Sequence, residues 1–270
     1  MKALVIDISK CNGCYNCQIA CKDEHVGNDW TPYAKPQPDT GQFWMKITDK
    51  VRGTVPKVKV SYLHDICQHC DEAPCSAACK QNAIYKRNDG AVIIDPQKCA
   101  GRRDCLDACP YEGAIYFNDN LSIAQKCTLC AHLLDRGWKE PRCVEACPTG
   151  ALKFGEENDL KDLIKKAEIL HPEYGAKPRV YYIGLPKSFI AGSVFDPNED
   201  ECIAGAAVTL TDSESGDTFR TRTDNFGDFW FDNLKTGAFS LSIEAKGFPI
   251  KRIESIRTDT DLNLGDIPLV

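Results

Sequence analysis

The chain has 270 residues, 16 of them Cys, and a formal net charge of −6. Cys is several times more frequent than in an average protein, and the negative charge argues against a nucleic-acid binder. The length predicts about two domains. The longest apolar runs are far too short to cross a bilayer, and no signal peptide fits in front of Cys11. We therefore expect a cytoplasmic chain without a membrane anchor of its own.

Short strands and short helices are predicted over residues 1–155, the first predicted domain, which contains fifteen of the Cys. Apolar or alternating segments indicate strands at residues 3–8, 83–86, 91–95, 114–117 and 151–154. A short helix is expected after the third or fourth Cys of each cysteine motif. These elements together indicate an α+β fold.

The fifteen Cys form four motifs. The first motif, Cys11, Cys14, Cys17 and Cys21, has the C-x2-C-x2-C-x3-C spacing of bacterial ferredoxins. The others are Cys67, Cys70, Cys75 and Cys79; Cys99, Cys105 and Cys109; and Cys127, Cys130, Cys143 and Cys147. Structural zinc closes as pairs of Cys pairs, and a disulfide framework needs a secreted context, so both explain this pattern less well. We predict iron–sulfur clusters, which are also expected to be required for folding.

An internal repeat supports this prediction. Residues 6–21 (IDISKCNGCYNCQIAC) align with residues 94–109 (IDPQKCAGRRDCLDAC), and three of the four Cys match. Arg102 stands where the first copy has Cys14. The repeat therefore predicts a duplicated, dicluster ferredoxin-like domain with one altered ligand position.

A long insertion, residues 22–63, separates the first two motifs and contains Trp30 and Trp44. A loop of this length is uncommon unless it is functional. It is either a packed surface excursion or a docking surface with aromatic anchors for a large partner. His64, His69 and Lys126 lie close to Cys residues in the sequence. Either His could tune a cluster through a hydrogen bond to sulfur, although a solvated or packed role is more common for all three.

The remainder of the chain contains a single Cys. Within residues 156–190 we expect an amphipathic helix over 158–170, followed by an extended connector over 176–190. Residues 191–270 show alternating segments such as 229–231 and 239–243, with recurring turn signals, and predict a β-sandwich of about seven strands. This part resembles transthyretin-like and collagen-adhesin-type repeat domains. Cys202 is expected to be an ordinary residue at a strand start.

The order of the four motifs resembles that of the four-cluster electron-transfer subunits of molybdenum and tungsten oxidoreductases, the dimethyl sulfoxide reductase family. Spacing alone leaves open which remote Cys completes which cluster. The resemblance implies that the first motif pairs with the fourth, and the second with the third. Transferred to this sequence, cluster 1 has Cys11, Cys14, Cys17 and Cys147, and cluster 2 has Cys127, Cys130, Cys143 and Cys21. Cluster 3 has Cys67, Cys70, Cys75 and Cys109, and cluster 4 keeps Cys99, Cys105 and Cys79.

Arg102 occupies the vacant corner of the fourth site. A guanidinium stays protonated and cannot ligate iron. The site therefore holds a 3Fe–4S cluster, holds a 4Fe–4S cluster completed by water or by Asp104, or is empty. Similar subunits with a non-ligand at this corner hold a 3Fe–4S cluster. The retention of three Cys argues against an empty site.

Five further segments narrow the resemblance to the small subunits of pyrogallol–phloroglucinol transhydroxylase-like enzymes, over essentially the whole chain. They are FWMKI (43–47), RGTVP (52–56), QKCTLCAHLLD (125–135), KPRVYY (177–182) and NFGDF (225–229). The resemblance implies a non-catalytic electron-transfer subunit with three 4Fe–4S clusters and the fourth site. Its partner in a heterodimer or higher assembly would be a large catalytic subunit that holds molybdenum on pyranopterin guanine dinucleotide and acts on phenols.

Two other interpretations remain open. One is a subunit of a different molybdenum or tungsten enzyme, acting on formate, sulfur compounds, arsenic or nitrate. The other is a free-standing polyferredoxin. The transhydroxylase pattern has lost the fourth cluster site, whereas three of its ligands persist here. This difference indicates net redox chemistry on the phenolic ring.

Overall fold

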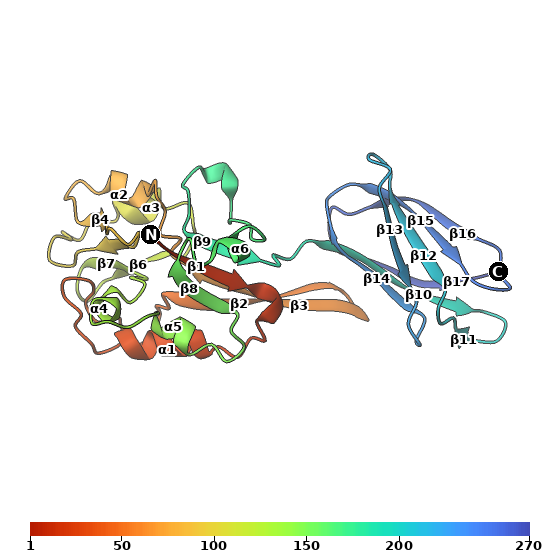
Figure 1. Ribbon diagram of the computed structural model, residues 1–270, viewed down its shortest axis with the longest axis horizontal. Coiled ribbons are helices and arrows are strands. Elements are labelled where there is room, and N and C mark those ends of the chain that lie inside the picture. Colours follow the sequence, from red (N-terminus) through yellow and green to blue (C-terminus); the bar gives the residue numbers. More distant parts are fainter. The chain divides into compact units, whose positions relative to one another are not determined.

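The computed structural model describes all residues, 1–270. The chain forms two compact units. Unit 1 consists of residues 1–50 and 61–185, and unit 2 consists of residues 51–60 and 186–270. All fifteen Cys of the four motifs lie in unit 1. Figure 1 labels the helices and strands of both units.

A three-stranded sheet in the order β8-β1-β9 is the centre of unit 1. Its middle strand, β1 (Lys2–Asp7), pairs antiparallel with β8 (Leu152–Glu156) and parallel with β9 (Val180–Ile183). Residues 3–6 are all buried, which explains why this strand is an unbroken apolar run rather than an alternating one. The strands predicted at 3–8 and 151–154 are confirmed. The predicted connector over 176–190 is wrong in part, because it contains β9.

Two further strand pairs lie next to the second and third motifs in the sequence. They are β4 (Ile84–Lys86) with β5 (Val92–Ile94), and β6 (Ile115–Asn118) with β7 (Ile123–Lys126). The strands predicted at 83–86, 91–95 and 114–117 are thereby confirmed. Short helices accompany the Cys, but their positions differ from the prediction. Three begin one residue before the third Cys of a motif: α1 (Asn16–His25), α2 (Pro74–Ala78) and α5 (Arg142–Glu145). Helix α3 (Asp104–Ala108) begins one residue before Cys105, the second Cys of its motif. The other, α4 (Ala131–Leu134), follows the second Cys of the fourth motif, and a 3-10 turn, η1 (Ile8–Lys10), precedes α1.

The helix predicted over 158–170 is much shorter. Only α6 (Lys161–Ile164) is helical, and it has no buried residue. A short helix gains most of its stability from packing an apolar face, and here the chain turns away so that Glu168 bridges to Tyr182 of β9. A second 3-10 turn, η2 (Pro172–Tyr174), follows.

The insertion has two parts. Its second part is a hairpin of β2 (Met45–Thr54) and β3 (Lys57–Ile66), and residues 51–60 at its tip belong to unit 2. Within unit 2, the buried side chain of Lys57 pairs with Asp228, and Arg52 pairs with Asp261 at 2.9 Å. A third pair joins Lys59 to Asp232, so three ion pairs fix the hairpin tip to the sandwich.

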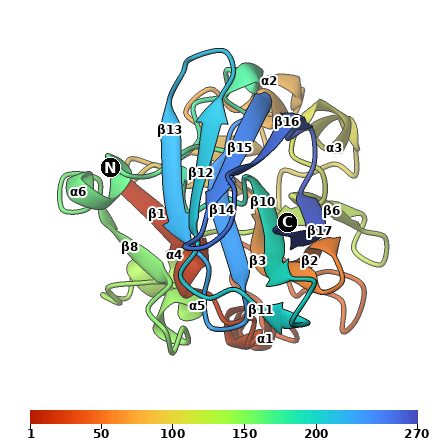
Figure 2. The same cartoon turned by 90° about the vertical axis from the view of Figure 1, so that its right-hand side faces the viewer.

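Unit 2 is a sandwich of two four-stranded sheets. One sheet contains β10 (Ser188–Asp196), β11 (Glu201–Cys202), β14 (Asp228–Leu234) and β17 (Leu262–Pro268). The other has the order β13 (Thr218–Arg222), β12 (Ala207–Asp212), β15 (Ala238–Glu244) and β16 (Lys251–Arg257) (Figure 2). The predicted alternation is confirmed, because Phe229, Phe231, Phe239, Leu241 and Ile243 are all buried between the sheets.

Candidate iron–sulfur centres

The fifteen Cys of unit 1 gather into four groups, and every Cys in the chain is a free thiol. In group 1, Cys11 interacts electrostatically with Cys14 and Cys147, and Cys17 interacts with all three. The loop between η1 and α1 is tight: Gly13 has φ +68°, and a Cβ there would lie 2.3 Å from the Tyr62 ring. Only glycine fits this turn, which presents three thiols on one side.

Group 2 is the most enclosed. Cys21 on α1 interacts with Cys127 and Cys130, and Cys143 on α5 interacts with the same three thiols. All four are buried. Helices α1 and α5 lie against each other, and this packing brings Cys21, the last Cys of the first motif, to Cys143, the third Cys of the fourth motif.

Group 3 combines the second and third motifs. Cys70 interacts with Cys67, Cys75 and Cys109. His69, between Cys67 and Cys70, has a positive φ of 47°. Its Nδ1 accepts the Val92 N–H at 3.0 Å, which ties this loop to strand β5. The sequence offers a sulfur contact as one role for His69; in the structure Nδ1 is bonded to the backbone, and the buried Nε2 has no hydrogen-bond partner, so this role stays a prediction.

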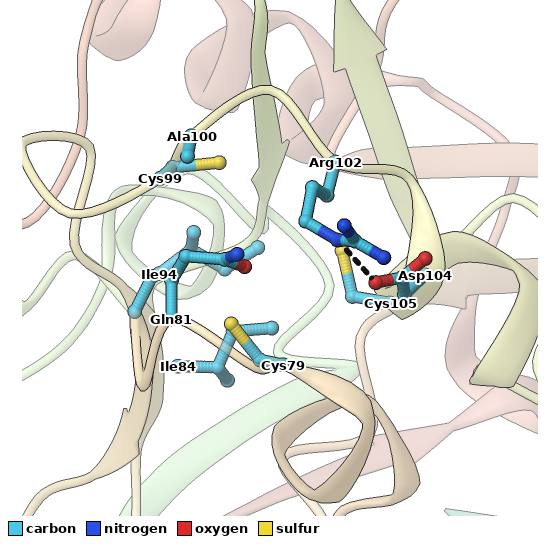
Figure 3. A pocket seen from close by; sticks show the side chains of 10 residues that line it. Cys79, Gln81, Ile84, Ile94, Cys99, Ala100, Arg102, Asp104 and Cys105 are labelled. Carbon is cyan, nitrogen blue, oxygen red and sulfur yellow. Dashed lines mark hydrogen bonds and ion pairs between the residues drawn. The ribbon is translucent and has the colours of Figure 1, made fainter.

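Group 4 contains three thiols. Cys105 on α3 interacts with Cys99 and Cys79, and these three side chains border one hollow together with Arg102 and Asp104 (Figure 3). Arg102 Nε donates to Asp104 Oδ2 at 2.7 Å. The Cys99 sulfur also accepts the Ala124 N–H at 3.4 Å. The carboxylate that the sequence offers as an alternative fourth ligand is therefore already engaged by Arg102.

The electrostatics of these groups favour bound cations. Burial raises the pKa of the Cys17, Cys127 and Cys130 thiols to about 12. Neighbouring thiols contribute to this rise, because several thiolates at close range repel one another. Iron supplies the positive charge that this arrangement lacks, and thiolates are the usual ligands of iron–sulfur clusters. The donor set of these groups therefore fits such clusters.

Interactions between the groups place them in a linear order. Cys17 of group 1 interacts with Cys143 of group 2, and Cys127 of group 2 interacts with Cys67 of group 3. Cys75 of group 3 interacts with Cys105 of group 4. Groups 1 and 4 are therefore the two ends, and group 2 is linked to group 3 in the middle.

Three buried side chains near the thiols differ from expectation. His64 lies beside Cys11 of group 1, with Nε2 4.0 Å from the sulfur, and not beside its sequence neighbour Cys67. Lys126 is buried rather than solvated, and its ammonium donates to the backbone carbonyls of Val92 and Cys127. His25, whose Nε2 lies 3.9 Å from the Cys130 sulfur, was not predicted. Its only sequence signal is its place one helical turn after Cys21.

The first part of the insertion is packed rather than exposed. Trp44 is 2% exposed, and Trp30 stacks on His132 with ring centroids 4.3 Å apart. Of the two alternatives for the insertion, these contacts favour the packed excursion for Trp30 and Trp44, which lie beside His132 and His25 near group 2. Cys202 is exposed and belongs to unit 2, whereas the four groups of thiols belong to unit 1. It is the last residue of β11 and not, as expected, at a strand start.

Two family models match the chain. The 4Fe-4S dicluster domain matches residues 58–157, and the carboxypeptidase regulatory-like domain matches residues 190–269. None of the helices has the length and apolar content needed to span a bilayer.

Several relatives are similar over most of the chain. The pyrogallol hydroxytransferase small subunit of Pelobacter acidigallici is 39% identical over 90% of both chains. A tetrathionate reductase subunit of Salmonella typhimurium is 34% identical over 70% of this chain and 74% of its own. A sulfite dehydrogenase subunit of Allochromatium vinosum is 35% identical over 69% of this chain and 84% of its own.

Proposed function

Since this chain belongs to the family of iron–sulfur electron-transfer subunits of molybdenum oxidoreductases, we propose that it serves a molybdopterin-dependent catalytic subunit that acts on phenolic substrates. The chain itself is not catalytic. The 39% identity to a pyrogallol hydroxytransferase small subunit over 90% of the chain supports the substrate class. The observation that carries the proposal is the linear order of four thiol groups, because electron transfer over a distance needs closely spaced centres.

Each of the four groups of Cys corresponds to one cluster site. We propose that groups 1, 2 and 3 each ligate a 4Fe–4S cluster through their four Cys. When bound, the clusters supply one-electron carriers, whose potentials depend on hydrogen bonds to sulfur and on exposure. The role of the chain is to hold the thiolates in place, exclude water from the middle groups and position polar groups toward sulfur.

Group 4 supports a 3Fe–4S cluster. Three thiols border the hollow, and Arg102 occupies the position that corresponds to Cys14. The ion pair between Arg102 and Asp104 argues against a carboxylate-completed 4Fe–4S cluster, because ligation by Asp104 would break it. The positive charge of Arg102 favours the reduced state of a neighbouring cluster, since reduction adds negative charge.

Net redox chemistry fits four sites better than transhydroxylation does. Moving a hydroxyl group between phenols has no net electron flow and needs no complete electron path. A path that keeps its fourth site fits hydroxylation or dehydroxylation of a phenol, coupled to an external acceptor or donor. The similarity to tetrathionate reductase and sulfite dehydrogenase subunits keeps a second candidate, a subunit for a sulfur-compound oxidoreductase.

Anaerobic purification through a tag on this chain tests the proposal. Molybdenum or tungsten together with one large polypeptide is expected in the eluate, and that complex should convert phenols only when an electron acceptor or donor is present. Conversion without either would refute the net redox proposal. Iron and sulfide on a stable lone chain would refute the subunit proposal and leave a free-standing polyferredoxin.

A further inference from the structure

Two buried histidines each face a single cysteine sulfur. His25 is the last residue of α1, and its Nε2 lies 3.9 Å from the sulfur of Cys130 in group 2. His64 is on β3, and its Nε2 lies 4.0 Å from the sulfur of Cys11 in group 1. Both side chains are 2% exposed. No other imidazole contacts a Cys sulfur.

The hydrogen-bond partners of the two imidazole rings indicate which ring nitrogen carries the proton. Nδ1 of both His25 and His64 has no hydrogen-bond partner. Nε2 faces sulfur, and a metal-bound thiolate offers only lone pairs. An unprotonated Nε2 would place two lone pairs against each other, whereas an Nε2–H can donate. The sulfur contact therefore selects the Nε2–H form of each ring.

The orientation of His25 is held from the outside by the first part of the insertion. Its ring packs against Trp44, with centroids 4.5 Å apart, and against the edge of His132 at 5.4 Å. His132 Nε2 is in turn 2.9 Å from Glu24 Oε1, and Glu24 also pairs with Arg142 at 3.3 Å. His132 and Glu24 are thus positioning residues: they help to hold the His25 ring, and His25 is the residue that donates to sulfur.

We propose that His25 and His64 each donate an Nε2–H···S hydrogen bond to a cluster-ligating thiolate, Cys130 and Cys11, and so raise the potentials of the clusters in groups 2 and 1. The inference rests on the proposed ligand assignment. A donor at sulfur stabilises the reduced cluster more than the oxidised one, because the reduced cluster carries more negative charge. The imidazole–sulfur contacts lie in groups 2 and 1, so the clusters of these two groups are made easier to reduce.

Redox titration of the anaerobically purified complex, followed by electron paramagnetic resonance, tests the inference. His25→Phe keeps an aromatic ring against Trp44 but removes the donor. At a fixed potential it should raise the oxidised-to-reduced ratio of one cluster by about tenfold, which is about 59 mV for a one-electron couple. His64→Phe should do the same to a different cluster. His25→Asn, which retains an N–H, should recover part of the shift, and His171→Phe, an exposed residue, should shift none.

Two measurements separate the two ways in which the inference can fail. Iron and sulfide content of the wild-type complex tests the cluster assignment itself, and clusters absent from the wild type would refute the proposed function. Iron-replete His25→Phe and His64→Phe proteins with unchanged ratios would overturn only the hydrogen-bond inference. If either variant fails to bind iron, pulsed electron paramagnetic resonance of the reduced wild type, labelled with [15N]histidine, replaces it. A weak nitrogen coupling on two clusters is expected, and its absence refutes the inference.

Discussion

Replacing Arg102 with Cys should rebuild the fourth cluster site. Arg102 is the only position at which the internal repeat loses a ligand, and the three other thiols already border one hollow. The ion pair lost with Asp104 is half-exposed, with side chains 47% and 38% exposed, so the fold should lose little stability. The smaller Cys side chain introduces no clash. The expected change is therefore compositional: one additional iron atom per chain and a 4Fe–4S cluster in place of a 3Fe–4S cluster.

Iron and sulfide analysis together with electron paramagnetic resonance measures this change. The signal of an oxidised 3Fe–4S cluster should be present in the wild type and absent from Arg102→Cys. Arg103→Cys is the matched control, because Arg103 is the adjacent exposed Arg and is not aligned with a ligand. An Arg102→Cys protein with the iron content and spectrum of the wild type would refute the 3Fe–4S assignment.

Three further outcomes are expected. Gly13→Ala should lose the iron of cluster 1, because its Cβ would lie 2.3 Å from the Tyr62 ring. The control Gly27→Ala has a similar φ and no atom within 4 Å of its Cβ, and it should keep all iron. Equal iron loss in both variants would show that backbone strain alone is responsible. Lys57→Ala should lower the free energy of unfolding by about 1–3 kcal/mol, because it leaves Asp228 without its buried partner. Denaturant unfolding should show a loss of less than about 1 kcal/mol for Lys59→Ala, because the ion pair of Lys59 with Asp232 is partly exposed. Cys105→Ser should abolish phenol conversion linked to an external acceptor, and undiminished acceptor-linked turnover would place group 4 outside the electron path.

Most of the fold follows from local sequence patterns. The errors arise where contacts between residues far apart in the sequence determine the secondary structure. The strand at the N-terminus was predictable because a short apolar run is a typical buried strand. Strand β9 was missed, because its two flanking Pro residues indicate a connector and its only sheet partner, β1, lies far away in the sequence. The helix over 158–170 was overpredicted, because periodicity cannot reveal that Glu168 pairs with Tyr182 instead.

The thiols of the candidate site were predictable, but their polar surroundings were not. Cys spacing identifies the motifs, and the resemblance implies their pairing. The structure brings the same Cys together, and their ligation of clusters stays a prediction. Sequence neighbours of Cys gave a poor guide to the other residues. His64 is three residues from Cys67 and yet contacts Cys11, and His25 is a single His with no motif around it. Such contacts depend on how α1, β3 and the insertion pack together, and this packing cannot be inferred from the spacing of neighbouring residues.

The exposure of the thiols follows the order of the groups. Group 1 contains the exposed Cys14 and the partly exposed Cys147, and group 4 contains the partly exposed Cys79 and Cys99. All four thiols of group 2 are buried. A store of electrons would not need two accessible ends, whereas a path between two partners does, because each partner must approach one terminal centre. The proposed net redox function therefore predicts electron exchange at group 4, and a purely hydroxyl-transferring enzyme would lack this exchange.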